Sequence, residues 1–154
     1  MDRPRLEALA AVMGLKNVLF LPRRPVTAIG ALLCRAEALL VHLQDDPLFA
    51  ITIPSRIQAY LAVGRPILCG VRGNGAELVQ QAGAGLCFEP ENPEALAGAV
   101  LALQGLSAEA RAVLGKNGQR FYQEHLSLQV GTQAFLGLFA RIMDTRPKLD
   151  TPLL

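Results

Sequence analysis

The stretch "PSRIQ", residues 54–58, carries the clearest chemistry in this sequence. We expect Ser55, after Pro54, to open a helix whose positive end carries unpaired backbone N–H groups. These groups belong to Arg56, Ile57 and Gln58. Such a helix start binds phosphate, and the guanidinium of Arg56 adds a full positive charge. The Ser55 hydroxyl can cap the helix or touch the anion, and a plain serine cap beside a solvated arginine is the alternative.

Other residues suited to ligand contact follow the expected strands or lie just inside this helix. Gln58 could hydrogen-bond to a ribose hydroxyl, or it is an ordinary glutamine on the helix surface. The turn formed by Gly73, Asn74 and Gly75 lets the backbone approach a ligand closely, although such turns are also common between a strand and a helix. Arg24 follows an apolar run, where it would contact a ligand or lie in a solvated basic loop.

The remaining reactive side chains indicate neither a catalytic residue nor a metal site. The two histidines, His42 and His125, lie far apart, no Cys–His spacing is typical of zinc, and the motif G-x-S-x-G is absent. Nothing positions a pair of carboxylates for glycoside hydrolysis. The cysteines at positions 34, 69 and 87 have apolar neighbours, which favours free thiols in a reducing cytoplasm. We therefore expect no catalytic residue, no metal and no other cofactor in this chain.

Short apolar runs separated by helical patterns must position the candidate residues. Apolar strands joined by single helices predict an α/β fold with a doubly wound, Rossmann-like parallel sheet. Ligands bind such sheets beyond the carboxyl ends of the strands, where Ser55 and the turn at Gly73 both fall. The sequence predicts four strands, "NVLFLP" (17–22), "ALLVHL" (38–43), "PILCGV" (66–71) and "AGLCF" (84–88).

Helices are expected between the strands and, as extra elements, after them. The C-terminal part has helix starts at Asn92-Pro93, at Ser107 and at Ser127. The last of these helices places Phe135, Leu138, Phe139 and Ile142 on one stripe. Earlier helices are expected over 4–13, from a cap at Thr27, from Ser55 to an end at Gly64, and after the turn at Gly73.

Composition excludes several classes of protein. The 154 residues suit a single domain, and 51% are hydrophobic while 5% are aromatic. A net charge of +2 is too small to favour nucleic-acid binding. No uncharged apolar run reaches the roughly 18 residues of a membrane span, and the N-terminus lacks the apolar core of a signal peptide.

The order of the motifs resembles the nucleotide-sugar-binding C-terminal domain of retaining glycosyltransferases with the GT-B fold, of the group 1, family 4 type. The resemblance runs from about residue 6 to residue 142 and rests on "NVLFLP", "IPSRIQAYLAVGRPILCGVRGNGAELVQQAG", "FEPENPEALAGAV" and "LGKNGQRFYQEHLSLQ". It implies that Ser55 and Arg56 hold the distal phosphate of a nucleotide-diphosphate sugar. It also implies that Gln58 meets the ribose and that Arg24-Pro25 lies against the base.

Three departures from the family pattern bear on the function. Gln58 and Ala50 stand where the family has a pair of glutamates. An acceptor-binding N-terminal domain and two βα units, which precede the segment 17–22 in the family, do not precede it here. We therefore expect residues 1–143 to be a partial donor-binding domain, inactive alone, and residues 144–154 to be a flexible tail.

The resemblance implies sugar transfer with retention, in bacterial surface-polysaccharide or glycolipid synthesis. It places the full enzyme in the cytoplasm, at the inner face of the membrane, with the missing acceptor domain or a partner subunit completing it. The alternative is a non-catalytic subunit or degenerate module that binds a partner chain. In either case an uncovered apolar edge or face predicts self-association.

Overall fold

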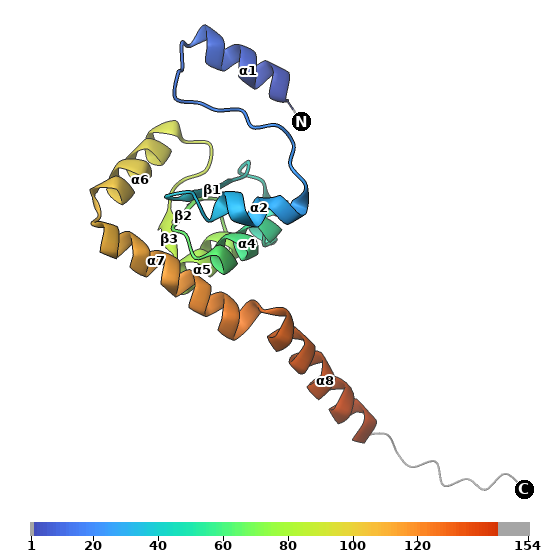
Figure 1. The fold of residues 1–154 in the computed structure, drawn as a ribbon. Helices are drawn as coiled ribbons and strands as arrows, with labels where there is room; N and C mark the ends of the chain where they lie inside the picture. The colour runs from blue at the N-terminus through green and yellow to red at the C-terminus, as the bar shows by residue number, and fades with distance from the viewer. Residues whose placement is uncertain (1, 145–154) are drawn as a thin grey trace, which may run out of the picture.

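Three parallel strands form the centre of the structure, a computed structural model that describes residues 2–144 (Figure 1). They are β1 (Leu39–His42), β2 (Ile67–Gly70) and β3 (Gly85–Cys87), and they lie side by side in the order β1-β2-β3. Both pairings are parallel. The loops that follow the strands therefore meet at one edge of the sheet, as expected for a ligand site in this class of fold.

Helices cover both faces of this sheet. Helices α4 and α5 share a buried core with one face, α7 packs against α4, and α6 packs against β2 and β3 from the other face. The predicted doubly wound α/β fold is thus confirmed. The helices are α1 (Arg3–Val12), α2 (Val26–Leu33), α3 (Pro47–Ala50), α4 (Ser55–Val63), α5 (Asn74–Gln81), α6 (Pro93–Gly105), α7 (Ala108–Phe121) and α8 (Leu128–Asp144), with a π-helical turn η1 (Tyr122–Leu126) before α8.

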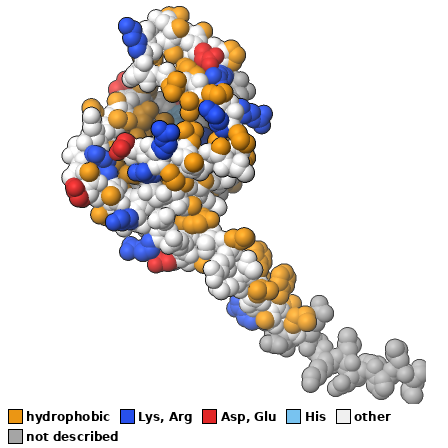
Figure 2. Space-filling view, viewed as in Figure 1, with side chains coloured by type: hydrophobic (Ala, Val, Ile, Leu, Met, Phe, Trp, Pro, Cys, Tyr) orange, Lys and Arg blue, Asp and Glu red, His pale blue; other side chains and the backbone are white. Residues whose placement is uncertain are grey.

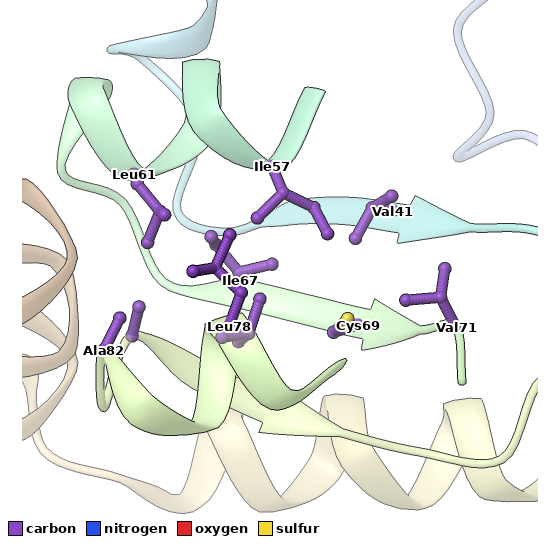
Figure 3. Close-up of a cluster of buried hydrophobic side chains, with 10 residues drawn as sticks. Val41, Ile57, Leu61, Ile67, Cys69, Val71, Leu78 and Ala82 are labelled. Atoms are coloured by element: carbon purple, nitrogen blue, oxygen red, sulfur yellow. The ribbon is translucent and has the colours of Figure 1, made fainter. Parts of the chain in front are cut away.

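The core lies between the strands and helices α4 and α5 (Figure 3). Val41, Ile57, Leu61, Ile67 and Val79 are fully buried there. Burying each side chain of this size stabilises the fold by roughly 1.5–3 kcal/mol. Because Ile57 belongs to this cluster, the start of α4 is fixed against the sheet.

Close glycine contacts hold α7 against α4. Gly64 ends α4 in the left-handed conformation, with φ of 73°, as the sequence predicts. A Cβ atom at Gly115 of α7 would lie only 2.2 Å from the carbonyl oxygen of Gly64. The absence of a side chain at Gly115 is therefore what lets the two helices meet at backbone distance.

The segment 17–22 is not a strand, so the sheet has three strands instead of the predicted four. Val18, Leu19 and Leu21 are exposed, Leu19 by 80%, and Phe20 is half-buried. The guanidinium of Arg3 donates hydrogen bonds to the carbonyls of Phe20 and Leu21, at 3.1 and 2.6 Å. An apolar run becomes a strand only beside another strand, and within residues 2–144 none lies next to this one.

Helix starts were predicted well in the C-terminal half and less well before it. The Asn92, Ser107 and Ser127 side chains each accept a hydrogen bond from a backbone N–H three residues on, at 2.9, 3.1 and 3.4 Å. Thr27 is not a cap, because α2 begins at Val26 and follows Pro25. The tail expected over 144–154 lies outside the described residues, apart from Asp144 at the end of α8.

Candidate functional site

The start of α4 presents Ser55 and Arg56 to solvent. The helix begins at Ser55 itself, after Pro54, and no side chain caps it, so the expected Ser55 cap is wrong. The Ile57 N–H donates to the Pro54 carbonyl at 2.9 Å. Within residues 2–144 the N–H groups of Ser55 and Arg56 make no hydrogen bond to the protein. This end of α4 therefore has two open donors beside an exposed guanidinium and the exposed amide of Gln58.

The turn before α5 lies directly against the loop that leads into α4. Asn74 Nδ2 donates a 3.0 Å hydrogen bond to the carbonyl of Ile51. A Cβ at Gly75 would lie 3.2 Å from Ile57 Cδ1 and 3.4 Å from Pro54 Cδ. The structure thus brings together two of the sequence-predicted motifs, residues 54–58 and residues 73–75, at the carboxyl ends of β1 and β2.

Arg24 lies elsewhere. It lines an open hollow of about 700 Å³ between the segment after α1 and helix α2. Leu19, Leu21, Leu32 and Arg35 line the same hollow, and none of the other predicted site residues does. Arg24 therefore lies apart from residues 54–58 and 73–75, which the structure brings together. A contact between the Arg24 side chain and a ligand at Ser55 stays a prediction.

Arg72 is a site residue that sequence reasoning missed. Its Nε lies 2.9 Å from Asp45 Oδ2, and its Nη2 lies 2.9 Å from Glu89 Oε1. These three residues follow β1, β2 and β3, so one guanidinium links the loops at the carboxyl ends of all three strands. The sequence signal that could have found it is its position, since Arg72 comes two residues after β2, at the carboxyl end of the sheet.

A second set of polar contacts joins the ends of β1 and β3. The N–H of Glu91 donates to His42 Nε2 at 3.0 Å, and Glu91 Oε2 accepts from the Asp45 N–H at 3.1 Å. The His42 ring lies parallel to that of Phe88, with centroids 6.4 Å apart. Glu91 has a φ of 58°, an unusual backbone conformation that these contacts help to hold. His42 is thus engaged in holding a loop.

Two thiols lie on neighbouring strands beneath the turn. Cys69 of β2 pairs in register with Cys87 of β3, and Cys69 is fully buried. The hydrogen bond from Cys69 lowers the pKa of the Cys87 thiol, and the Gln80 side chain acts in the same direction. The same bond, together with burial, raises the pKa of Cys69. Cys87 also lines an open hollow of about 470 Å³ with Arg72, Gly73 and Gln80.

Comparison with known proteins identifies the family. The family model described as "Glycosyl transferases group 1" matches residues 1–105. The chain belongs to this family. This group 1 glycosyltransferase chain is similar in structure to sucrose-phosphate synthase from Thermosynechococcus elongatus, with a TM-score of 0.78 and 20% identity over 94% of this chain and 35% of that one. No curated protein sequence matches it.

A second solved structure shows the same fold. WaaG, a glycosyltransferase involved in lipopolysaccharide biosynthesis, superposes with a TM-score of 0.65 and 19% identity over 87% of this chain and 34% of its own. The group 1 chain thus spans about a third of either solved chain. The fold is shared at these low identities, and the expected resemblance to glycosyltransferases with the GT-B fold is confirmed.

The structure locates the two residues, Gln58 and Ala50, that stand in place of the expected glutamate pair in this group 1 chain. Gln58 is exposed on the first turn of α4, and Ala50 ends α3 with its carbonyl toward Gly73.

Within residues 2–144, no three His, Cys, Asp or Glu side chains gather as a set of metal ligands. None of the helices described is both long and apolar enough to cross a membrane.

Proposed function

We propose that this chain is the donor-binding portion of a glycosyltransferase and holds a nucleotide-diphosphate sugar at the carboxyl ends of β1 and β2. The observation that carries the proposal is the 3.0 Å hydrogen bond from Asn74 to Ile51, which holds the turn before α5 against the loop before α4. The Ser55 and Arg56 amides and the Arg56 guanidinium then face the diphosphate. Gln58 hydrogen-bonds to the ribose, and the backbone of Gly73 and Gly75 lies near the sugar.

The chemistry assigned to these residues is electrostatic. As the bond between sugar and diphosphate breaks, negative charge grows on the leaving group, and helix amides with Arg56 offset it. Arg72 supports this role, because it compensates the carboxylates of Asp45 and Glu89 that would otherwise repel the anion. No residue of the chain is assigned as a catalytic base, and no metal or other cofactor is invoked.

The finer parts of the proposal follow from the family. Transfer proceeds with retention at the anomeric carbon, and the acceptor belongs to bacterial surface-polysaccharide or glycolipid synthesis. The similarity to WaaG supports this choice of acceptor, because that protein is involved in lipopolysaccharide biosynthesis. The enzyme works in the cytoplasm, at the inner face of the membrane. Acceptor binding comes from an N-terminal domain or a partner subunit, because the chain spans about a third of the two solved structures.

A nuclear magnetic resonance titration with UDP and GDP tests the donor site. The backbone amide peaks of residues 55–58 and 73–75 should shift as either nucleotide is added to isotope-labelled protein, while those of α6 and α7 stay in place. Shifts at Arg24 would add this residue to the site. A well-dispersed spectrum that responds to neither nucleotide would overturn the proposal.

A non-catalytic module that binds a partner chain is the second candidate, and the free edge of β1 favours it. Leu39 donates its N–H to Pro66, just before β2, and Leu43 donates to Gly70, so the N–H groups of Leu40 and His42 point away from β2. The Tyr60 hydroxyl contacts the outward carbonyl of Leu40 at 3.4 Å. A partner that protects the β1 amides from hydrogen exchange, together with no nucleotide binding, would select this function.

A further inference from the structure

Cys69 and Cys87 form a pair of thiols on neighbouring strands. Cys69 of β2 is in register with Cys87 of β3 and the strands are parallel, so both side chains leave the same face of the sheet. Figure 3 shows Cys69 within the buried cluster between the strands and helices α4 and α5. Cys87 packs against that cluster, and a hydrogen bond joins the two thiols.

The spacing of the pair permits a disulfide. Neighbouring strands lie about 4.8 Å apart. A disulfide joins residues whose Cα atoms are roughly 4.4–6.8 Å apart, and residues in register on adjacent strands fall within this range. The contacts of Cys69 and Cys87 are all made by residues 2–144 among themselves, so the pairing depends on no other segment.

The two thiols differ in their access to solvent. Cys69 is fully buried, whereas Cys87 is half-buried and lines the open hollow of about 470 Å³ with Arg72, Gly73 and Gln80. The hydrogen bond from Cys69 favours the Cys87 thiolate and lowers its pKa, and the same bond with burial raises the pKa of Cys69. Because the thiolate is the reactive form, Cys87 meets an oxidant first and Cys69 stands behind it.

We propose that Cys87 is a site of oxidation by hydroperoxides and that Cys69 is its resolving thiol. The Cys87 sulfur attacks one oxygen of the peroxide, so that an S–O bond forms and the O–O bond breaks. The other oxygen leaves as hydroxide or alkoxide and takes a proton from solvent. The sulfur is thereby oxidised to a sulfenic acid and the peroxide is reduced.

The second step closes the disulfide. The Cys69 sulfur attacks the sulfenic sulfur of Cys87, the S–S bond forms and the S–O bond breaks. The hydroxide that leaves takes the Cys69 proton and becomes water. No further oxidant is consumed, and a thiol reductant reverses the product to the two thiols.

The position of Cys87 links this chemistry to the start of α5. In the reduced protein the Cys87 thiol donates to the carbonyl of Ala76 at 3.7 Å, in the first turn of the helix. A disulfide has no S–H group, so this carbonyl loses its donor. Disulfides of a reducing compartment are transient and serve in redox sensing. The inference does not depend on the proposed function, since neither thiol is assigned to nucleotide binding.

Peroxide treatment of a Cys34→Ser variant tests the pair, because Cys69 and Cys87 are then the only cysteines. A small molar excess of hydrogen peroxide should reduce the free thiols, counted after denaturation, from two per chain to none. Dithiothreitol should restore both. Mass spectrometry of the unreduced digest should find the Cys69 peptide joined to the Cys87 peptide.

The oxidation is best run on dilute protein. Hydrophobic side chains run along α8, where Phe135 and Phe139 are exposed (Figure 2). Such a surface favours contact between chains. Dilution limits that contact, and the mass of the intact product distinguishes a disulfide within one chain from a disulfide between two.

Two further variants in the Cys34→Ser background separate the steps. In Cys69→Ala the resolving thiol is absent, so Cys87 should stop at the sulfenic acid, which dimedone traps as a covalent adduct. Cys87→Ser is the matched control, in which the buried Cys69 should stay reduced. Circular dichroism shows whether each variant is folded, and Cys69→Ser repeats the test in case Cys69→Ala does not fold.

Any of four results would overturn the inference. The first is a Cys87 that stays reduced in the folded Cys34→Ser protein, and the second is a disulfide that joins two chains. The third is a folded Cys69→Ala variant that gives no dimedone adduct. The fourth is a Cys87→Ser variant whose Cys69 is oxidised as fast as the pair.

Discussion

Gly73 and Ala50 lie in backbone contact, so close that a Cβ atom on Gly73 would stand 2.1 Å from the Ala50 carbonyl oxygen. Gly73 has a φ of 65° and ψ of −139°, a region that side chains rarely allow. The contact sets how near the turn before α5 comes to the loop before α4. The proposed donor site therefore depends on a position where only glycine fits.

We expect Gly73→Ala to lower the free energy of unfolding by about 2 kcal/mol or more, from backbone strain and from displacement of Ala50. Urea denaturation followed by circular dichroism measures the change. The matched control is Gly98→Ala, on the exposed side of α6, where an added Cβ meets nothing within 4 Å. This variant should be unchanged or more stable by up to about 1 kcal/mol, because alanine favours helix. Equal stability of both variants would show that the two loops do not meet as described.

Arg56→Gln should weaken UDP and GDP binding roughly three- to tenfold, as expected for the loss of a charge-assisted contact at an exposed site. The side chain is exposed at the start of α4, so the fold should not change. Nucleotide affinity is read from the shifts of residues 55–58 at several ionic strengths, and its salt dependence should also decrease. Arg120→Gln removes the same charge from the exposed surface of α7 and should leave affinity unaltered. Equal losses in both variants would indicate a general charge effect and count against the assigned phosphate contact.

The sequence-based predictions are correct where a contact joins residues close together in the sequence, and they fail where it joins residues far apart. Asn92 and Ser107 cap helices through contacts three residues away, and such local signals predict correctly. The segment 17–22 has a strand-like composition, but a strand needs a neighbouring chain that no local pattern supplies. The ion pairs of Arg72 join residues 27 and 17 positions apart, so only the assembled sheet reveals them. The contact between the turn at Gly73 and the loop at Ala50 also joins residues far apart in the sequence, so local sequence patterns do not predict it.

Ser107→Ala should destabilise the protein by about 1 kcal/mol, because the Ser107 Oγ accepts the Ala110 N–H at the start of α7. Ser55→Ala should leave the stability of the protein unchanged, since Ser55 makes no capping bond in α4. Urea titrations of the two variants, compared with the wild type, provide the measurement. A loss of stability in Ser55→Ala as large as that in Ser107→Ala would restore Ser55 as a helix cap.

The effect of Ser107→Ala should also depend on pH. Hydrogen bonds from the backbone N–H of Glu109 and from the Ser107 side chain lower the pKa of the Glu109 carboxyl. A carboxyl whose pKa is lowered on folding adds stability above its unfolded pKa, and this contribution is lost as the pH falls through the folded pKa. Removing Ser107 removes one cause of the shift. The stability difference between wild type and variant should therefore shrink on acidification through that range, and a difference that grows would contradict this account of the helix start.

Cys87 should be alkylated by iodoacetamide at a lower pH than an ordinary thiol, whose pKa is about 8.5. The cause is the hydrogen bond from Cys69, which favours the Cys87 thiolate and lowers its pKa. The reaction is best followed by mass spectrometry in a Cys34→Ser background, because Cys34 is exposed and would be modified as well. Cys69 should stay unmodified while the protein is folded, since its side chain is fully buried. Cys69→Ala then removes the main cause of the shift and should move the alkylation midpoint of Cys87 to higher pH. A midpoint that does not move would mean that the paired thiols of β2 and β3 do not share a proton in this way.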